Sequence, residues 1–259
     1  MSSPNLGILS GISYVSGLDY FKGIHEKVLS QTPICHLMAP NPSVVMVSVD
    51  CDLYVSYLME GAFDEVANHL LGGVNRLVAA GCDMLVIASN TGHVAAPAIQ
   101  LAHPTLKILH IADCSAYYIK SKGYVNVGLV GTRPTMEEDY LKNRLAMHGI
   151  GTMVPCQAED RTEIYRIIIE ELSYNKFLDS SRQKLIAIIA ALRDRGAEAC
   201  ILGCTEIELL LKEGDVTGIE LIPSAQVHID MTANILLGRM CVEEVLPKKG
   251  SPEGLEDLS

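Results

Sequence analysis

The sequence predicts an α/β fold with two similar lobes, each a mostly parallel sheet flanked by helices, and an active-site cleft between them. Two observations support this prediction. Short apolar runs alternate with helical patterns along the 259 residues, which is typical of parallel α/β chains. Two β-turn-α segments from the first half also return in the second half, which indicates a duplicated unit.

The strands are predicted from the apolar runs, and the helices from the apolar periodicity between them. The predicted strands are 6–9, 44–49, 84–88, 107–110, 125–130, 152–154, 199–202 and 219–222. The clearest predicted helices are 62–80, 137–148, 159–172, 182–195 and 225–237.

The two internal repeats lie at similar offsets. Residues 81–91 align without a gap with residues 196–206, an offset of 196 − 81 = 115. Residues 6–11 align with residues 127–132, an offset of 127 − 6 = 121. We therefore expect a first lobe of residues 1–111 plus 224–245, a second lobe of residues 112–223, and a mobile tail at 246–259. Ligands of open parallel sheets bind beyond the carboxyl ends of the strands, so the equivalent strand ends are expected to face one cleft.

Composition excludes several classes of function. The formal net charge is −11 and the longest basic run is Lys248-Lys249, which argues against nucleic-acid or anionic-membrane binding. No apolar run reaches the roughly 18 residues that span a bilayer, and no basic segment precedes the first apolar residues. The eight cysteines form no C-x-x-C pair, which argues against a zinc site or a redox dithiol. Most of them lie in apolar stretches, as free buried cysteines do, which favours a reducing, cytoplasmic location.

Ser89 and Cys204 occupy equivalent places in the longer repeat, each at a predicted strand end and helix start. Backbone N–H groups at a helix start favour an anion, which would stabilise a thiolate at Cys204 or hold a substrate carboxylate. Asn90, Thr91 and Thr205 suit both helix capping and ligand binding. In the alternative interpretation Ser89 is an N-cap and Cys204 a buried thiol, but their matched positions favour a shared site.

Other residues are candidates for a supporting role. His93 and His228 are candidates for adjusting protonation, and Glu206 or Asp113 for orienting such a histidine, although a structural role is equally open for each. The chain has no G-x-G-x-x-G, P-loop or G-x-S-x-G motif. Two small proton-carrying groups and N–H donors suit removal and return of a proton on a carbon acid, without a metal or an organic cofactor.

Several motifs resemble the aspartate/glutamate racemase superfamily of cofactor-independent racemases. The strongest is GLVGTRPTMEEDYLKNRL at 128–145, followed by IIIEEL at 167–172, GCTEIELL at 203–210, HIAD at 110–113 and GILSGIS at 7–13. The resemblance implies two α/β lobes, a small carboxylate substrate, a homodimer or higher homo-oligomer, and proton transfer by one residue from each lobe.

The resemblance also implies roles for residues. Cys204 matches the catalytic cysteine of the second lobe, and Ser89 takes the place of the first-lobe cysteine in S-N-T-G-H. Asn90, Thr91 and Thr205 match residues that hold the substrate carboxylate, and Ser13 matches a position that lines the cleft.

Three departures from the family pattern concern the substrate. Glu163 stands where the family usually has a Lys for a substrate carboxylate, so a second carboxylate would be repelled unless Glu163 points to solvent and Arg161 or Arg166 takes over. The opening loop, G-G-M-S-x-E-S-T in the family, has Val15 and Gly17 here, and an expected Asp-Thr pair is Pro223-Ser224.

The sequence therefore favours an amino acid racemase in which Cys204 abstracts the α-proton opposite Ser89. The alternative is a lyase on the same scaffold that cleaves dimethylsulfoniopropionate to dimethyl sulfide and acrylate with Cys204 as the base. Glu163 would then suit the sulfonium cation. Decarboxylation of malonate-like acids, or ligand binding without catalysis, also stays open.

Overall fold

The computed structural model describes residues 4–32 and 41–247, and the chain divides into two compact units. Unit 1 comprises Met1–Cys114 and Ser224–Glu244, and unit 2 comprises Ser115–Pro223 and Val245–Ser259. Most of the tail predicted at 246–259 lies outside the described residues. In the described ranges no helix is both long and apolar enough to cross a membrane.

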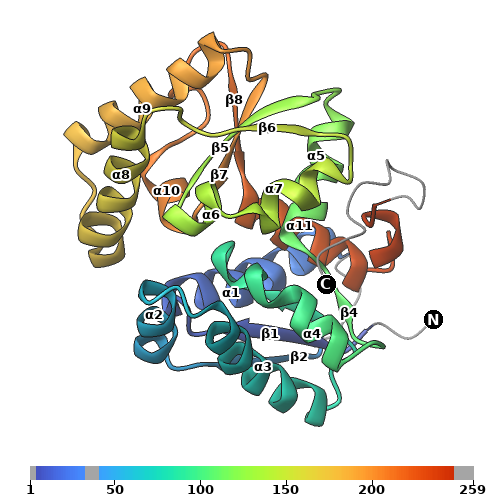
Figure 1. Ribbon diagram of the computed structural model, residues 1–259. Helices are drawn as coiled ribbons and strands as arrows, with labels where there is room; N and C mark the ends of the chain where they lie inside the picture. The colour runs from blue at the N-terminus through green and yellow to red at the C-terminus, as the bar shows by residue number, and fades with distance from the viewer. Residues whose placement is uncertain (1–3, 33–40, 248–259) are drawn as a thin grey trace. The chain divides into compact units, whose positions relative to one another are not determined.

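Unit 1 contains a four-stranded parallel sheet of order β2-β1-β3-β4 (Figure 1). Its strands are β1 (Leu6–Ser10), β2 (Val44–Ser48), β3 (Met84–Ile87) and β4 (Lys107–Ile108). Its helical segments are α1 (Tyr14–Gln31), α2 (Cys51–Met59), α3 (Phe63–Ala79), η1 (Thr91–Ala95), α4 (Ala96–Ala102) and α11 (Ser224–Leu236), and η4 (Val242–Glu244) follows near the end of the unit.

Unit 2 contains a second four-stranded parallel sheet, of order β6-β5-β7-β8. Its strands are β5 (Asn126–Gly131), β6 (Gly151–Met153), β7 (Ala199–Gly203) and β8 (Glu220–Pro223). Its helical segments are α6 (Arg133–Glu137), α7 (Asp139–Ala146), α8 (Ala158–Arg166), η2 (Ile167–Glu171), η3 (Leu172–Tyr174), α9 (Asp179–Asp194) and α10 (Thr205–Leu210). Helix α5 (Ile111–Ser121) contains the boundary between the units.

The two sheets confirm the predicted α/β class and the internal duplication. Strands β1, β2, β3 and β4 correspond in order and direction to β5, β6, β7 and β8. The longer repeat superimposes β3 on β7, and the shorter repeat superimposes β1 on β5. All eight predicted strands are present, with ends displaced by one or two residues.

Buried side chains line both faces of the central strands, as expected where helices cover a parallel sheet. In β1, Leu9 packs with the core residues of α3, while its neighbour Ile8 is buried on the other face, because side chains alternate along a strand. In β7, Cys200 and Leu202 pack with the apolar faces of α8 and α9, while Ile201 is buried on the other face.

Two predicted helices differ from the structure. The segment predicted at 137–148 is the shorter helix α7, because Glu138 adopts an extended conformation that separates α7 from the preceding α6. The segment predicted at 159–172 is α-helical only to Arg166, then a π-helical turn through Glu171 and a short 3-10 turn. Asn175, in the left-handed conformation, ends that 3-10 turn.

Candidate active site

Two equivalent strand ends carry the candidate catalytic residues. Ser89 follows β3 in unit 1 and Cys204 follows β7 in unit 2. Each lies at the carboxyl edge of its sheet, where ligands of parallel sheets bind.

Small residues shape the edge of unit 2. Gly131 at the end of β5 pairs in register with Gly203 at the end of β7. A Cβ atom on Gly131 would lie 2.8 Å from the Gly203 carbonyl oxygen, and one on either glycine would lie 2.9 Å from Cγ2 of Thr135. Both positions therefore require glycine, because Thr135 packs closely against the ends of β5 and β7. Cys204 is the residue that follows Gly203 at the end of β7.

Cys204 is the N-cap residue of α10 and its side chain is 7 % exposed. Its thiol donates a hydrogen bond to Oε2 of Glu206, at a Sγ–O distance of 3.1 Å. The hydroxyl of Thr205 donates to the same oxygen at 2.7 Å. One carboxylate oxygen is therefore held beside the thiol.

These contacts determine the protonation state of Cys204. Burial and the adjacent Glu206 carboxylate raise the pKa of the thiol well above its ordinary value of 9.0. The N–H groups of Glu206 and Ile207 lower that pKa, as expected for a helix start, but they do not outweigh burial and charge. The resting side chain is a thiol, in contrast to the thiolate expected from the helix start alone.

Ser89 has a different environment. Its hydroxyl oxygen accepts a hydrogen bond from the N–H of Gly92 at 3.2 Å, and its carbonyl oxygen lies 2.7 Å from Nδ1 of His93. The Ser89 N–H also donates to the Ile87 carbonyl oxygen. Within the described ranges Ser89 makes these three hydrogen bonds. No carboxylate or imidazole is hydrogen-bonded to its hydroxyl there.

The two predicted supporting histidines are buried in unit 1 with fixed roles. Nε2 of His93 accepts from the Ile111 N–H at 3.2 Å, so Nδ1 carries the proton that is donated to the Ser89 carbonyl. His228 lies between the Tyr20 hydroxyl, 2.9 Å from Nδ1, and the Leu109 carbonyl oxygen, 2.8 Å from Nε2. Burial lowers the pKa of His228 to about 3, with a smaller effect from His93.

Asn90 and Thr91 are also buried at the edge of unit 1. The amide nitrogen of Asn90 donates to the hydroxyl of Ser224 at 3.0 Å, which gives a structural role to one of the departures from the family pattern. Ser13 is the N-cap of α1, and its hydroxyl accepts from the Ser16 N–H at 3.5 Å.

The departure at Gly17 has a local cause. A Cβ atom on Gly17 would lie 1.8 Å from Oγ of Ser10. When the family pattern is aligned on Ser13, it has glycine at position 10 and threonine at position 17. The side chain at position 10 therefore fills the space that a side chain at position 17 would need.

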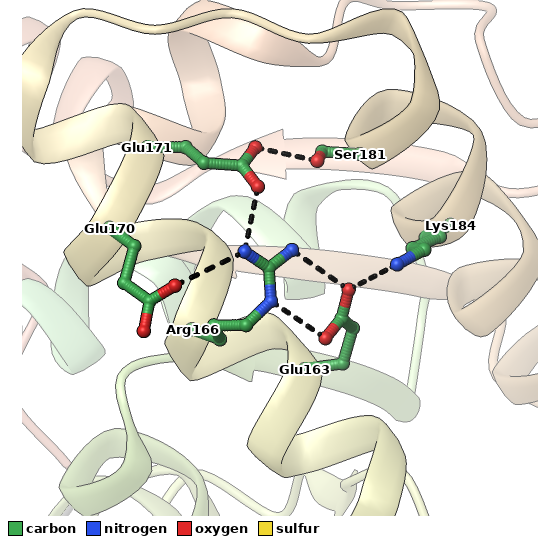
Figure 2. A network of polar contacts seen from close by, with 6 residues as sticks. All are labelled: Glu163, Arg166, Glu170, Glu171, Ser181 and Lys184. Carbon is green, nitrogen blue, oxygen red and sulfur yellow. Dashed lines mark hydrogen bonds and ion pairs between the residues drawn. The ribbon is translucent and has the colours of Figure 1, made fainter.

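Glu163 and its neighbours form the polar network of Figure 2. The Glu163 carboxylate makes two hydrogen bonds to the guanidinium of Arg166, at 2.9 and 3.0 Å, and an ion pair with Lys184 at 2.5 Å. These contacts lower the pKa of Glu163 to about 2. Arg166 also pairs with Glu170 and Glu171.

Arg161 is likewise committed to structural contacts. It pairs with Glu137 at 3.0 Å and donates to the carbonyl oxygens of Pro155 at 2.7 Å and Cys156 at 3.1 Å. Neither Arg161 nor Arg166 is thus an unpaired cation that could replace the missing lysine.

The sequence did not single out Thr135 and Arg133, two residues of unit 2 that follow the end of β5. The available signal for Arg133 and Thr135 was their place a few residues after β5, just beyond the repeat that ends at Thr132. In the described ranges no group of three His, Cys, Asp or Glu side chains is placed to hold a metal ion.

Comparison with known proteins identifies the family. The sequence model of the Asp/Glu/Hydantoin racemase family matches residues 9–232. A proposed Asp/Glu racemase from Yersinia pestis is 32 % identical, with a TM-score of 0.80 over 90 % of this chain and 98 % of that chain. An aspartate racemase homologue from Pyrococcus horikoshii is 26 % identical, with a TM-score of 0.76 over 90 % of this chain and 99 % of that chain.

A more distant structure, the aspartate racemase of Picrophilus torridus, has the same fold at 21 % identity, with a TM-score of 0.66 over 93 % of this chain and 96 % of that chain. The family match covers most of the chain and includes both strand ends described above. The chain belongs to the Asp/Glu/Hydantoin racemase family.

Proposed function

We propose that the protein is a cofactor-independent amino acid racemase in which Cys204 removes the α-proton and Ser89 serves the opposite face of the substrate. Membership of the racemase family supports the reaction class. The observation that carries the proposal is the hydrogen bond from the Cys204 thiol to Glu206. It supplies what a buried thiol needs before it can act as a base, namely an adjacent proton acceptor.

The proposed first step transfers the thiol proton from Sγ of Cys204 to Oε2 of Glu206. The resulting thiolate takes the α-proton and leaves a carbanion whose charge is delocalised onto the substrate carboxylate. The N–H groups of Glu206 and Ile207, which already favour negative charge on Cys204, stabilise the thiolate. Thr205 keeps Glu206 in position through its own hydrogen bond.

Ser89 then returns a proton to the other face. A hydroxyl is a weak acid, and within the described ranges no base is hydrogen-bonded to it. Ser89 is consequently a poorer base than Cys204, and we expect the enzyme to process one enantiomer faster than the other. Asn90, Thr91 and Thr205 are proposed to hold the α-carboxylate.

Incubation of the enzyme with single enantiomers of amino acids in deuterium oxide tests this function. We expect deuterium at the α-carbon and the appearance of the opposite enantiomer, both seen by NMR and chiral chromatography. Absence of exchange for every amino acid tested would exclude the racemase.

The lyase alternative relied on Glu163 as a partner for a sulfonium cation. Because Glu163 is already paired with Arg166 and Lys184, its charge is largely compensated. Release of dimethyl sulfide from dimethylsulfoniopropionate would nevertheless decide for the lyase.

A further inference from the structure

We propose that Arg133 binds the second carboxylate of an acidic amino acid substrate, in place of the lysine that is missing at position 163. This inference rests on the proposed racemase function and names its substrate class. It follows from the ion pairing of the arginines in α6 and α8 and from the position of Arg133 beside the strand that ends at Cys204.

The negative charge of Glu163, which argued against an acidic substrate, is compensated by neighbouring cations. Its carboxylate is hydrogen-bonded to Arg166 and paired with Lys184, and its lowered pKa reflects these two cations. Figure 2 shows the Glu163 carboxylate joined to both Arg166 and Lys184. A carboxylate with two cationic partners repels another anion much less than an isolated one does.

The three arginines of α6 and α8 differ in how closely they are paired with carboxylates. Arg161 and Arg166 each have a short ion pair, at 3.0 and 2.9 Å, and further acceptors around the guanidinium. In the described ranges Arg133 makes one ion pair, with Glu137 at an N–O distance of 4.0 Å. Glu137 lies closer to Arg161, at 3.0 Å. In the same ranges the remaining polar contact of Arg133 is a 3.5 Å hydrogen bond to Thr162.

Arg133 is accessible to solvent and lies against an aromatic ring. The Arg133 side chain is 50 % exposed, and its guanidinium carbon lies 5.7 Å from the centre of the Tyr165 ring. A guanidinium held against an aromatic ring keeps its N–H groups available to a planar anion. The arginine is therefore oriented but carries no strong counter-ion.

Arg133 and Cys204 follow the ends of adjacent strands. Arg133 follows Gly131 by two residues, and Cys204 follows Gly203 by one, while Gly131 and Gly203 are register partners on adjacent strands. Adjacent strands lie about 4.8 Å apart, so both residues begin at the same part of the carboxyl edge. A substrate whose α-carbon lies at Cys204 would then extend its second carboxylate toward Arg133.

The first experiment measures α-deuterium incorporation into aspartate and into alanine by Arg133→Met and Arg133→Lys. For Arg133→Met we expect the KM for aspartate to rise at least about tenfold, since a bidentate guanidinium–carboxylate contact is lost. The KM for alanine and both kcat values should change less than about twofold. Arg133→Lys should restore part of the aspartate affinity. The matched control is Arg193→Met, which removes an arginine bonded to Asp194 and the Thr217 carbonyl.

A second experiment keeps the test independent of catalysis. Calorimetric titration with succinate and with propionate compares one and two carboxylates on the same protein. The parent should bind succinate more tightly, and Arg133→Met should remove that preference. If the parent exchanges no amino acid but shows this preference, the racemase proposal fails while the role of Arg133 holds. Equal losses for aspartate and alanine, or an unchanged succinate preference, would overturn the role of Arg133.

Discussion

The edges that carry Ser89 and Cys204 have the same backbone origin but different chemistry. Both residues follow the third strand of a four-stranded parallel sheet with the same strand order. At Cys204, a carboxylate accepts the thiol proton and two N–H groups favour the anion. At Ser89, the hydroxyl caps a turn and a histidine holds the carbonyl oxygen instead.

Ser89 and Cys204 thus occupy equivalent backbone positions in the two units, but the side chains around them determine their acid–base chemistry. Glu206 is two residues after Cys204, and the equivalent residue after Ser89 is Thr91. An anionic carboxylate is a much better proton acceptor than a neutral hydroxyl, so the two halves are unequal as bases. Substitutions at Cys204, Ser89 and Glu206 test this asymmetry.

Replacing Cys204 should have the largest effect. In Cys204→Ala we expect α-deuterium exchange to fall by roughly 10²–10⁴-fold, the contribution of a positioned proton-transfer group. The control is Cys200→Ala, which removes a buried thiol from β7, the strand that precedes Cys204. That control should change thermal stability more than the exchange rate, and similar exchange losses in both variants would contradict the role of Cys204.

Replacing Ser89 should separate exchange from inversion. In Ser89→Ala, Cys204 can still remove and return a proton on one face, so deuterium should enter while inversion falls by about 10²-fold. Ser89→Cys supplies a more acidic group and should increase inversion above the parent rate. Chiral chromatography and NMR on the same samples measure both quantities. Unchanged inversion in Ser89→Ala would show that another group serves that face.

Glu206→Gln should give two results of opposite direction. Loss of the carboxylate removes a charge that raises the pKa of Cys204, so the pH midpoint for alkylation of this thiol should move to lower pH. The exchange rate should nevertheless fall about tenfold or more, because the proton acceptor is gone. Peptide mass spectrometry after alkylation distinguishes Cys204 from the exposed cysteines. A faster enzyme with a lower midpoint would mean that Glu206 only suppresses the thiolate.

Acid pH should weaken the two units over different ranges. His228 has a folded pKa of about 3 against an ordinary value of 6.5, so the stability of its neutral form is complete above about pH 6.5 and is lost as the pH falls toward 3. Glu163 has a folded pKa of about 2 against 4.5, so its contribution is complete above about pH 4.5 and is lost as the pH falls toward 2.

Hydrogen exchange at pH 7 and 5, corrected for the intrinsic rate, measures this difference. Segments of unit 1 around His228 should lose protection first, with a slope of up to about 1.4 kcal/mol per pH unit. His228→Gln should remove that slope. Equal loss of protection in the network of Glu163 over the same interval would contradict the assignment.

The sequence alone determined the class of fold and the two candidate catalytic positions. Apolar runs and their periodicity follow directly from burial, so all eight strands were predicted, and the repeats located Ser89 and Cys204 at equivalent strand ends. The family motifs then indicated the reaction class. Both kinds of information are local, since each depends on residues that are neighbours in the chain.

The tertiary structure decided the electrostatics. The ion pair of Glu163 with Lys184 joins residues from different helices, and the space at Gly17 depends on the side chain of Ser10 across a loop. The protonation of Cys204 depends on how deeply packing buries it. Sequence spacing does not specify such distances, because charge and burial act through space, so only the folded contacts show that Arg161 and Arg166 have closer carboxylate partners than Arg133.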